Sequence, residues 1–245
     1  QRRNLVGAIL AAGIGLALPG ATKSGAADLE QYSGSKPRAY VIRGMERFRK
    51  GLVKESIQDF DKAIELDGAE AGLLWQRGLS LYYADRFEDA AVQFQRDVAL
   101  NPRDTEEAVW NFLAQARQSG GSVEKAQGQM ISIVGETRPY MKVVYDVYAG
   151  KRDVSELESL ATKADELMAR PQKKKGGLFS FGEGRDEALQ TSFYSWLYLG
   201  LWEEARGRQE EARKCLLKAA GSEYGRSQDY MWYLAAVHCK VRGWQ

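Results

Sequence analysis

The side chains that most often carry out chemistry are scarce in this sequence. It contains one histidine, His238, and two cysteines, Cys215 and Cys239, among 245 residues. Metal sites, thiol catalysis and histidine-based acid–base chemistry therefore have few candidate residues. Gly182 and Gly184 are too few to form a glycine-rich phosphate loop. We expect a protein that is not an enzyme and that holds no cofactor and no metal.

The two cysteines are expected to stay unpaired. If Cys215 and Cys239 lie on antiparallel helices joined near residues 222–226, they are offset along the helix axis by about 9 Å, too far for an undistorted disulfide. We expect two buried thiols. His238 stands among apolar residues, which favours a packed histidine over a ligand.

Composition points to a folded protein without an extreme electric field. The chain is 44% hydrophobic and 28% charged, which is enough apolar material for a core or a short solenoid. Its 35 basic and 33 acidic residues are interspersed and give a formal charge of +2. Nothing in this balance would recruit nucleic acid, so we expect no nucleic-acid partner.

A repeat is the strongest pattern in the chain. Gly44 and Gly78 are 34 residues apart (78 − 44). The same spacing separates four further pairs: Phe60 and Phe94, Ile64 and Val98, Leu66 and Leu100, Asp67 and Asn101. Apolar residues recur at helical spacing inside each unit, which predicts amphipathic helices. The expected helices are 38–50, 54–66, 71–84 and 87–100, followed by a less regular pair at 105–118 and 122–134.

Glycine, proline and capping residues support this division. Gly44 and Gly78 are placed where a side chain would hold paired helices apart. Asn101-Pro102 ends one helix, and Asp104 with Glu107 is a capping pattern for the next.

A 34-residue helix–turn–helix period resembles that of the tetratricopeptide-repeat (TPR) family. The resemblance covers residues 37–134 and again 190–242, where Trp196, Leu199, Gly200, Ala212 and Ala219 match the family's spacing. It implies an all-α fold, a TPR-type helical-hairpin solenoid with extra packing and capping helices. Glu204 with Arg208, and Glu210 with Lys214, are expected as charge pairs on the outer faces of the last unit.

A looser likeness connects the chain to the bacterial outer-membrane TPR lipoprotein that scaffolds cell-wall hydrolases. It rests on Arg77-Gly78 to Tyr82-Tyr83, on Trp110 with Leu113-Ala114, and on Tyr148-Ala149-Gly150. No lipid-bearing cysteine follows the apolar N-terminal run, so the likeness does not imply a lipid anchor.

The N-terminal residues 1–27 have the composition of a targeting signal. Arg2 and Arg3 precede an apolar run from Leu5 to Leu18, and small residues follow Pro19. This order is typical of a signal peptide, and the paired arginines suggest the twin-arginine route. It resembles the second half of a plastid transit peptide that directs a protein into the thylakoid lumen, and a bacterial signal would look similar. The alternative is a retained apolar helix that keeps the protein peripheral to a membrane.

The remaining chain divides by composition. We expect a linker at 28–37, TPR units 1–3 at 38–134, connecting helices at 135–170, a flexible basic loop at 171–185, and a C-terminal TPR unit with a capping helix at 186–245. In the connecting part, Ser155 and Glu158 are the expected cap of a helix with one apolar stripe. The closing helix is expected at 227–241.

The TPR resemblance implies a concave groove lined by the first helix of each pair, a suitable surface for a peptide or helix of a partner. Its members would include Arg38, Met45, Arg49, Trp75, Gln76, Tyr82, Trp110 and Arg117. For the aromatic residues, burial beneath the extra helices is the alternative. A second candidate is the loop with Lys173, Lys174, Lys175, Phe179 and Phe181, for which a solvated tether is the alternative.

The resemblance and the targeting signal together suggest a non-catalytic scaffold in the thylakoid lumen, a subunit or an assembly or stabilisation factor of a photosystem. Its partners would be proteins of a membrane complex. The alternative is a bacterial periplasmic TPR adaptor that recruits hydrolases. An enzyme with a hidden site is a third hypothesis, in which an acid such as Asp146 or Glu187 would be essential.

Overall fold

The structure, a computed structural model, describes residues 36–72, 74–170 and 183–244. Within these residues the chain forms eleven α-helices and two short 3-10 helices, without any β-strand. The all-α expectation is confirmed. Residues 1–27 and most of the predicted basic loop lie outside the described residues.

The first four α-helices pack one on the next. They are α3 (Pro37–Arg49), α4 (Val53–Leu66), α5 (Trp75–Tyr83) and α6 (Phe87–Leu100), and each contacts its successor. A 3-10 helix, Gly68–Gly72, precedes α5, so the helix expected from residue 71 begins four residues later. Gly44 and Gly78 lie at the helix contacts, where an added Cβ would stand 2.9 Å from the Phe60 ring and 2.7 Å from the Phe94 ring.

Five of the described helices end in the same hydrogen-bonded turn, with a left-handed residue at position 51, 85, 150, 207 or 243. After α3, the N–H of Gly51 donates to the Phe48 carbonyl and that of Leu52 to the Arg47 carbonyl, and Gly51 has a φ of 77°. This is a Schellman turn, which needs a left-handed residue. Residue 85 repeats the turn after α5, with Asp85 at a φ of 56°. Gly207 repeats it between α11 (Glu183–Ala205) and α12 (Gln209–Ala220).

The third predicted hairpin is incomplete. Helix α7 (Thr105–Arg117) begins at the Asp104 cap, as expected, because the Asp104 carboxylate accepts from the N–H groups of Glu106 and Glu107. Its partner α8 spans only Val123–Gly128, so the expectation of a helix to residue 134 is wrong. The following segment is rich in β-branched residues, contains a left-handed Gly135 and ends at Pro139, all of which disfavour a helix.

The second half of the molecule packs α9 (Pro139–Tyr148) and α10 (Val154–Ala169) against α11. The cap of α10 is Asp153, whose carboxylate accepts from the Ser155 N–H. The expectation that Ser155 and Glu158 form the cap is therefore wrong by two residues, because an aspartate carboxylate stands ahead of the serine. α10 is tied to α11 by Asp165, which accepts from Ser192 Oγ and from Trp196 Nε1.

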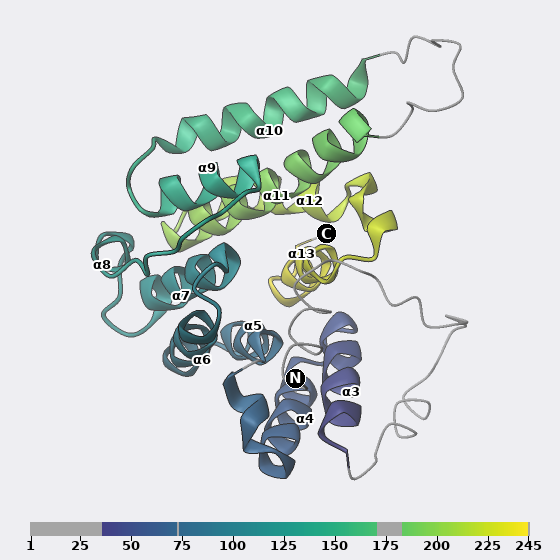
Figure 1. The fold of residues 1–245 in the computed structure, drawn as a ribbon. Coiled ribbons are helices and arrows are strands. Elements are labelled where there is room, and N and C mark those ends of the chain that lie inside the picture. The colour runs from purple at the N-terminus through teal and green to yellow at the C-terminus, as the bar shows by residue number, and fades with distance from the viewer. Residues whose placement is uncertain (1–35, 73, 171–182, 245) are drawn as a thin grey trace.

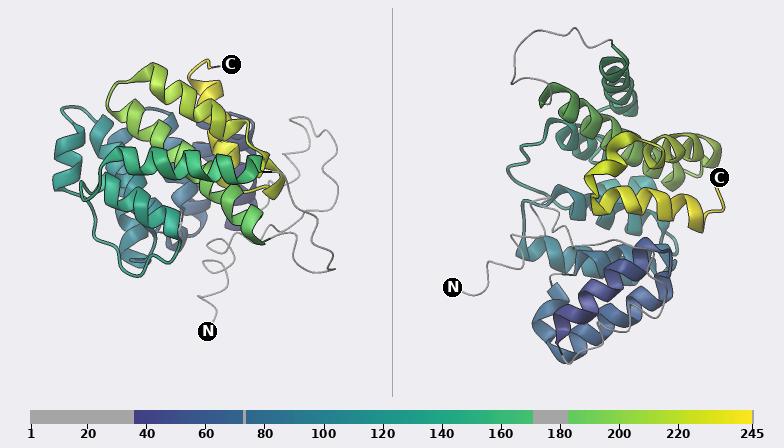
Figure 2. Two further views of the ribbon diagram at one scale, coloured as in Figure 1. Left: turned by 90° about the horizontal axis from the view of Figure 1, so that it is seen from above. Right: turned by 90° about the vertical axis from the view of Figure 1, so that its right-hand side faces the viewer.

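The last helix returns to the first. After α12, a 3-10 helix (Glu223–Ser227) leads into α13 (Tyr230–Val241), which contacts both α12 and α3 (Figure 1). Figure 2 shows α13 in yellow between the purple α3–α4 pair and the green helices of the second half. Helices α3 and α13 contact each other although all the other described helices lie between them in the sequence. Across residues 36–72, 74–170 and 183–244, no helix combines the length and the apolar character needed to cross a membrane.

Candidate partner-binding surface

Three of the residues expected in the groove are in the core. Gln76 and Tyr82 are fully buried and Trp110 is 2% exposed. The rings of Phe94 and Phe87 and the neighbouring Tyr83 surround the last two. The expectation that Gln76, Tyr82 and Trp110 line an open groove is corrected, because the chain's own later helices add a further layer over this face.

Helix α13 covers the face formed by α3 and α5. The Tyr230 ring stacks on Phe48, with centroids 5.6 Å apart, and meets Trp75 edge-on at 5.2 Å. Such offset-stacked and edge-to-face pairs are the favoured aromatic geometries. Aromatic side chains of the first helices are therefore paired with an aromatic side chain of the last.

Arg49 joins the same contact from α3. Its guanidinium lies 4.7 Å from the Tyr233 ring centroid and 5.5 Å from that of Tyr230, and it also pairs with Glu46 at 2.6 Å. Cation–π contacts of this kind hold an arginine in a fixed orientation. Lys240 adds a bond from α13 to the Lys50 carbonyl, at 2.8 Å.

Part of the predicted groove stays accessible along this contact. Arg38 is exposed, and Met45, Arg49 and Trp75 on α3 and α5 are half-buried, as is Tyr233 on α13. We name the line formed by Met45, Arg49, Trp75 and Tyr233 the α3–α13 seam. It presents an apolar, an aromatic and a cationic side chain to solvent at once.

Arg117, the last of the predicted groove residues, belongs to a buried ion cluster. Its guanidinium donates to the Tyr82 hydroxyl at 3.2 Å and to Glu204 Oε2 at 2.9 Å. Arg242 from the end of α13 donates to Glu204 Oε1 at 2.6 Å. One carboxylate with a 2% exposed side chain thus holds helices α7, α11 and α13 together.

Glu204 corrects the expectation of an outer-face pair with Arg208. Arg208 pairs instead with the adjacent Glu203. The four-residue spacing of Glu204 and Arg208 suited a surface pair, but α11 is covered on most of its circumference, and residue 204 faces inward. Sequence reasoning missed this cluster. One sequence signal for this cluster was Asp85, an aspartate at the position that Gly51 occupies one 34-residue period earlier. In the structure the Asp85 carboxylate lies 4.0 Å from the Arg117 guanidinium and 3.7 Å from that of Arg242.

His238 is buried beside this cluster. Its Nδ1 lies 2.9 Å from the Tyr83 hydroxyl and its ring meets the Tyr83 ring edge-on. Burial, and then the charges of Arg242 and Arg117, hold the pKa of His238 well below its usual value. Burial likewise raises the pKa of Tyr83, so its hydroxyl keeps its proton. His238 is a packed histidine, as expected, with a polar partner that the sequence did not indicate.

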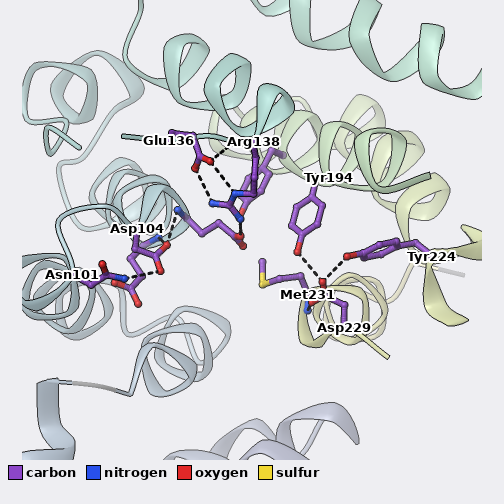
Figure 3. A network of polar contacts seen from close by, with 11 residues as sticks. Asn101, Asp104, Glu136, Arg138, Tyr194, Tyr224, Asp229 and Met231 are labelled. Atoms are coloured by element: carbon purple, nitrogen blue, oxygen red, sulfur yellow. Dashed lines mark hydrogen bonds and ion pairs between the residues drawn. The ribbon is translucent and has the colours of Figure 1, made fainter. Parts of the chain in front are cut away.

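A second polar network lies between α7 and the start of α13 (Figure 3). Arg138 bridges Glu136 and Glu106, at 2.8 and 2.6 Å, and Tyr198 donates to the other oxygen of Glu106 at 3.1 Å. Burial raises the pKa of Glu106 to about 7. The network ties α7 to α11 and to the irregular segment before α9.

The start of α13 is fixed by Asp229. Its Oδ1 accepts from the Met231 N–H, which caps the helix, and its Oδ2 accepts from the hydroxyls of Tyr194 and Tyr224 at 2.9 and 2.6 Å. Figure 3 shows both tyrosine hydroxyls converging on this carboxylate. The N-terminal end of α13 is therefore anchored to α11 and to the preceding 3-10 helix.

The remaining candidate residues are the two cysteines, the possible metal ligands and the basic loop. Cys215 and Cys239 are free and buried, as expected, and burial raises both thiol pKa values, that of Cys215 to about 11. Among the described residues no cluster of three or more His, Cys, Asp or Glu side chains could hold a metal ion. The predicted loop site with Lys173, Lys174, Lys175, Phe179 and Phe181 lies outside the described residues.

Comparison with known proteins adds no assignment. Neither a scan against models of protein families nor a search of curated proteins finds a match to this chain.

Proposed function

We propose that this chain is a non-catalytic protein–protein interaction scaffold built as a TPR-type solenoid with packing and capping helices. The close contacts of Gly44 with Phe60, of Gly78 with Phe94 and of Gly200 with Leu216 support the repeat, since each joins residues 16 positions apart. The Schellman turns at residues 51 and 85 support the 34-residue period.

One observation carries the scaffold proposal: helix α13 packs on Phe48, Arg49 and Trp75, which lie on α3 and α5. The Tyr230 ring packs against Phe48 and Trp75, and the Arg49 guanidinium lies over the Tyr233 ring. Aromatic and arginine side chains are those that dominate protein–protein contacts. We propose that a partner binds along the accessible edge of the same surface, the α3–α13 seam together with Arg38.

For the partner we propose a photosynthetic membrane complex in the thylakoid lumen, of which this chain is a subunit or an assembly factor. The support is the composition of residues 1–27 together with the TPR resemblance. The second candidate is a periplasmic adaptor that recruits cell-wall hydrolases, favoured by the likeness around Trp110 and Tyr148.

The test is an affinity purification from solubilised thylakoids with the wild-type chain as bait. We expect photosystem subunits to be recovered, and several-fold fewer with the double substitution Arg38→Gln and Arg49→Gln, which removes two cations of the proposed surface. Lys54→Gln, at an exposed position of α4, is the matched control and should bind as the wild type does.

Circular dichroism and urea unfolding of all three proteins separate lost binding from lost folding. Recovery of no photosynthetic subunit would remove the photosynthetic proposal. Recovery of hydrolases from a bacterial envelope extract would favour the periplasmic adaptor. Equal recovery with the double variant would place the partner elsewhere on the chain.

A further inference from the structure

The two ends of α13 are held by different chemistry. At its start, Asp229 accepts three hydrogen bonds, from one backbone N–H and two tyrosine hydroxyls. At its end, the buried His238 and the Arg242 guanidinium contact α5 and α11. One of the contacts at the C-terminal end is made by an ionisable imidazole.

His238 can accept the hydrogen bond of the Tyr83 hydroxyl only as a neutral ring. We assign its Nδ1 as the acceptor of the Tyr83 hydroxyl, 2.9 Å away, which puts the ring proton on Nε2. Nε2 is buried without a hydrogen-bond partner and stands 3.6 Å from Glu204 Oε1. Arg242 and Arg117 already occupy the two oxygens of that carboxylate.

We propose that the C-terminal half of α13 is an acid-released latch: protonation of His238 detaches it from α5 and α11 and uncovers the Tyr83 side of α5. The latch is a property of the chain alone and goes beyond the proposed scaffold function, because it needs no partner.

The charges around the ring oppose a second proton. The titratable and charged groups that act on His238 are Tyr83 from α5, Glu204 from α11, and the guanidinium groups of Arg117 from α7 and Arg242 at the end of α13. Asp85, from the turn after α5, faces both guanidinium groups. Two guanidinium groups are balanced by two carboxylates, of which Asp85 is 63% exposed at its side chain. An imidazolium would add a third positive group beside Glu204, whose two oxygens already accept from Arg117 and Arg242, at a buried position.

Protonation also reverses a hydrogen bond. A charged imidazole has N–H donors on both nitrogens, so Nδ1 can no longer accept from Tyr83 and donates to the hydroxyl oxygen instead, which takes from the Tyr83 O–H the acceptor it has in the docked state. Tyr83 is 4% exposed, and burial raises its pKa, so its hydroxyl does not ionise to compensate. Release of the helix end lets water solvate the imidazolium, which is the state that acid favours.

The direction of the pH dependence follows from the lowered pKa of His238. The released state takes up a proton near the ordinary histidine value of about 6.5, whereas the docked state does not until lower pH. The docked helix end is therefore most stable well above about pH 6.5. Below that pH the opening equilibrium rises, and it approaches tenfold for each pH unit once the released-state imidazole is mostly protonated, until the docked-state pKa is reached.

The chain provides its own reporters for this test. His238 is its one histidine, so imidazole NMR resonances follow this side chain without mutation. Cys239 neighbours His238 on α13, and Cys215 lies on α12, with both thiols buried. The ratio of their alkylation rates in one molecule, measured by mass spectrometry of peptides, cancels the pH dependence of thiol chemistry.

We expect the Cys239-to-Cys215 ratio to rise about fivefold between pH 6.5 and 5.5, in step with the imidazole titration. In His238→Asn, whose amide oxygen can accept from Tyr83 without ionising, the ratio should stay flat. A constant ratio in the wild type, the same rise in the variant, or a rise of both cysteines together would overturn the latch. The wild-type measurement decides the matter if the variant does not fold.

Discussion

Glycines 44, 78 and 200 occupy positions where helices touch through a large side chain. A Cβ added at Gly78 would stand 2.7 Å from two atoms of the Phe94 ring, and one at Gly200 would stand 2.6 Å from Leu216. Each ring or branched side chain is fully buried and has no room to move aside. Glycine sets the distance between the paired helices at these points.

Gly78→Ala should therefore destabilise the protein although alanine is the better helix former. Overpacking costs about 1–3 kcal/mol, against a helix-propensity gain of about 0.5–1 kcal/mol. We expect a net loss of about 1–2 kcal/mol in urea unfolding. Gly184→Ala is the control, because that helical glycine has nothing within 4 Å, and it should be neutral or stabilising. Equal effects at both positions would contradict the close-contact account.

Among the helices, α13 connects the two ends of the described chain. It joins α3, from the start of the described chain, to α12, and its buried contacts include Tyr230, Leu234, Ala235 and His238. A helix that packs on the exposed face of the first helices shields apolar surface that would otherwise contact solvent. The stability of α13 thus determines how much of the α3–α5 surface is covered.

Asp229, at the start of α13, should contribute more to the free energy of unfolding than an ordinary helix cap does. Asp229→Ala removes the cap and leaves the hydroxyls of Tyr194 and Tyr224 unpaired in buried positions, which we expect to cost about 2–4 kcal/mol. Asp153→Ala removes only the cap of α10, at about 1 kcal/mol. Urea unfolding measures both. Amide exchange should quicken in α13 with the first variant and in α10 with the second.

Asp229→Asn is a further control, since an amide oxygen can still cap the helix. It should lose less stability than Asp229→Ala. If the two aspartate-to-alanine variants lost the same stability, the tyrosine contacts in Figure 3 would contribute nothing.

At the scale of the whole molecule, buried carboxyl groups and His238 change the stability of the fold in opposite directions as pH rises. Burial, followed by the charges of neighbouring acids, raises the pKa of Glu107 to about 10, and burial raises that of Asp97 to about 7. Each has an oxygen without a hydrogen-bond partner among the described residues. These groups are bound to protons more tightly in the folded state than in the unfolded one, so their contribution to stability falls as pH rises above about 4.

Glu107→Gln removes the largest of these effects while keeping the shape of the side chain. Relative to the wild type, we expect this variant to gain stability as pH rises from 5 to 8, by at most about 1.4 kcal/mol per pH unit. Urea unfolding at several pH values measures the difference. Glu187→Gln, at an exposed position of α11, is the control. A difference that does not change with pH would show that Glu107 ionises normally in the fold.

Local pattern alone determined most of the helical content. The amphipathic period of residues 54–66 and 87–100, the Asp104 cap and the two glycine contacts are consequences of side chains within one hairpin, and they are found where the sequence indicates. The prediction of a helix to residue 134 was wrong at residues 129–134. The β-branched residues there disfavour the helix that the TPR resemblance implies.

Tertiary structure decided which surfaces remain open. Trp110, Tyr82 and Glu204 have the types and spacing of surface or groove residues, yet all three are buried. Glu204 is paired with arginines from α7 and from the end of α13. The position of α13 against α3 depends on contacts between residues nearly 190 positions apart, such as Lys240 with the Lys50 carbonyl. Helical periodicity records which face of a helix is apolar, but the element that covers that face is selected by packing of the whole chain.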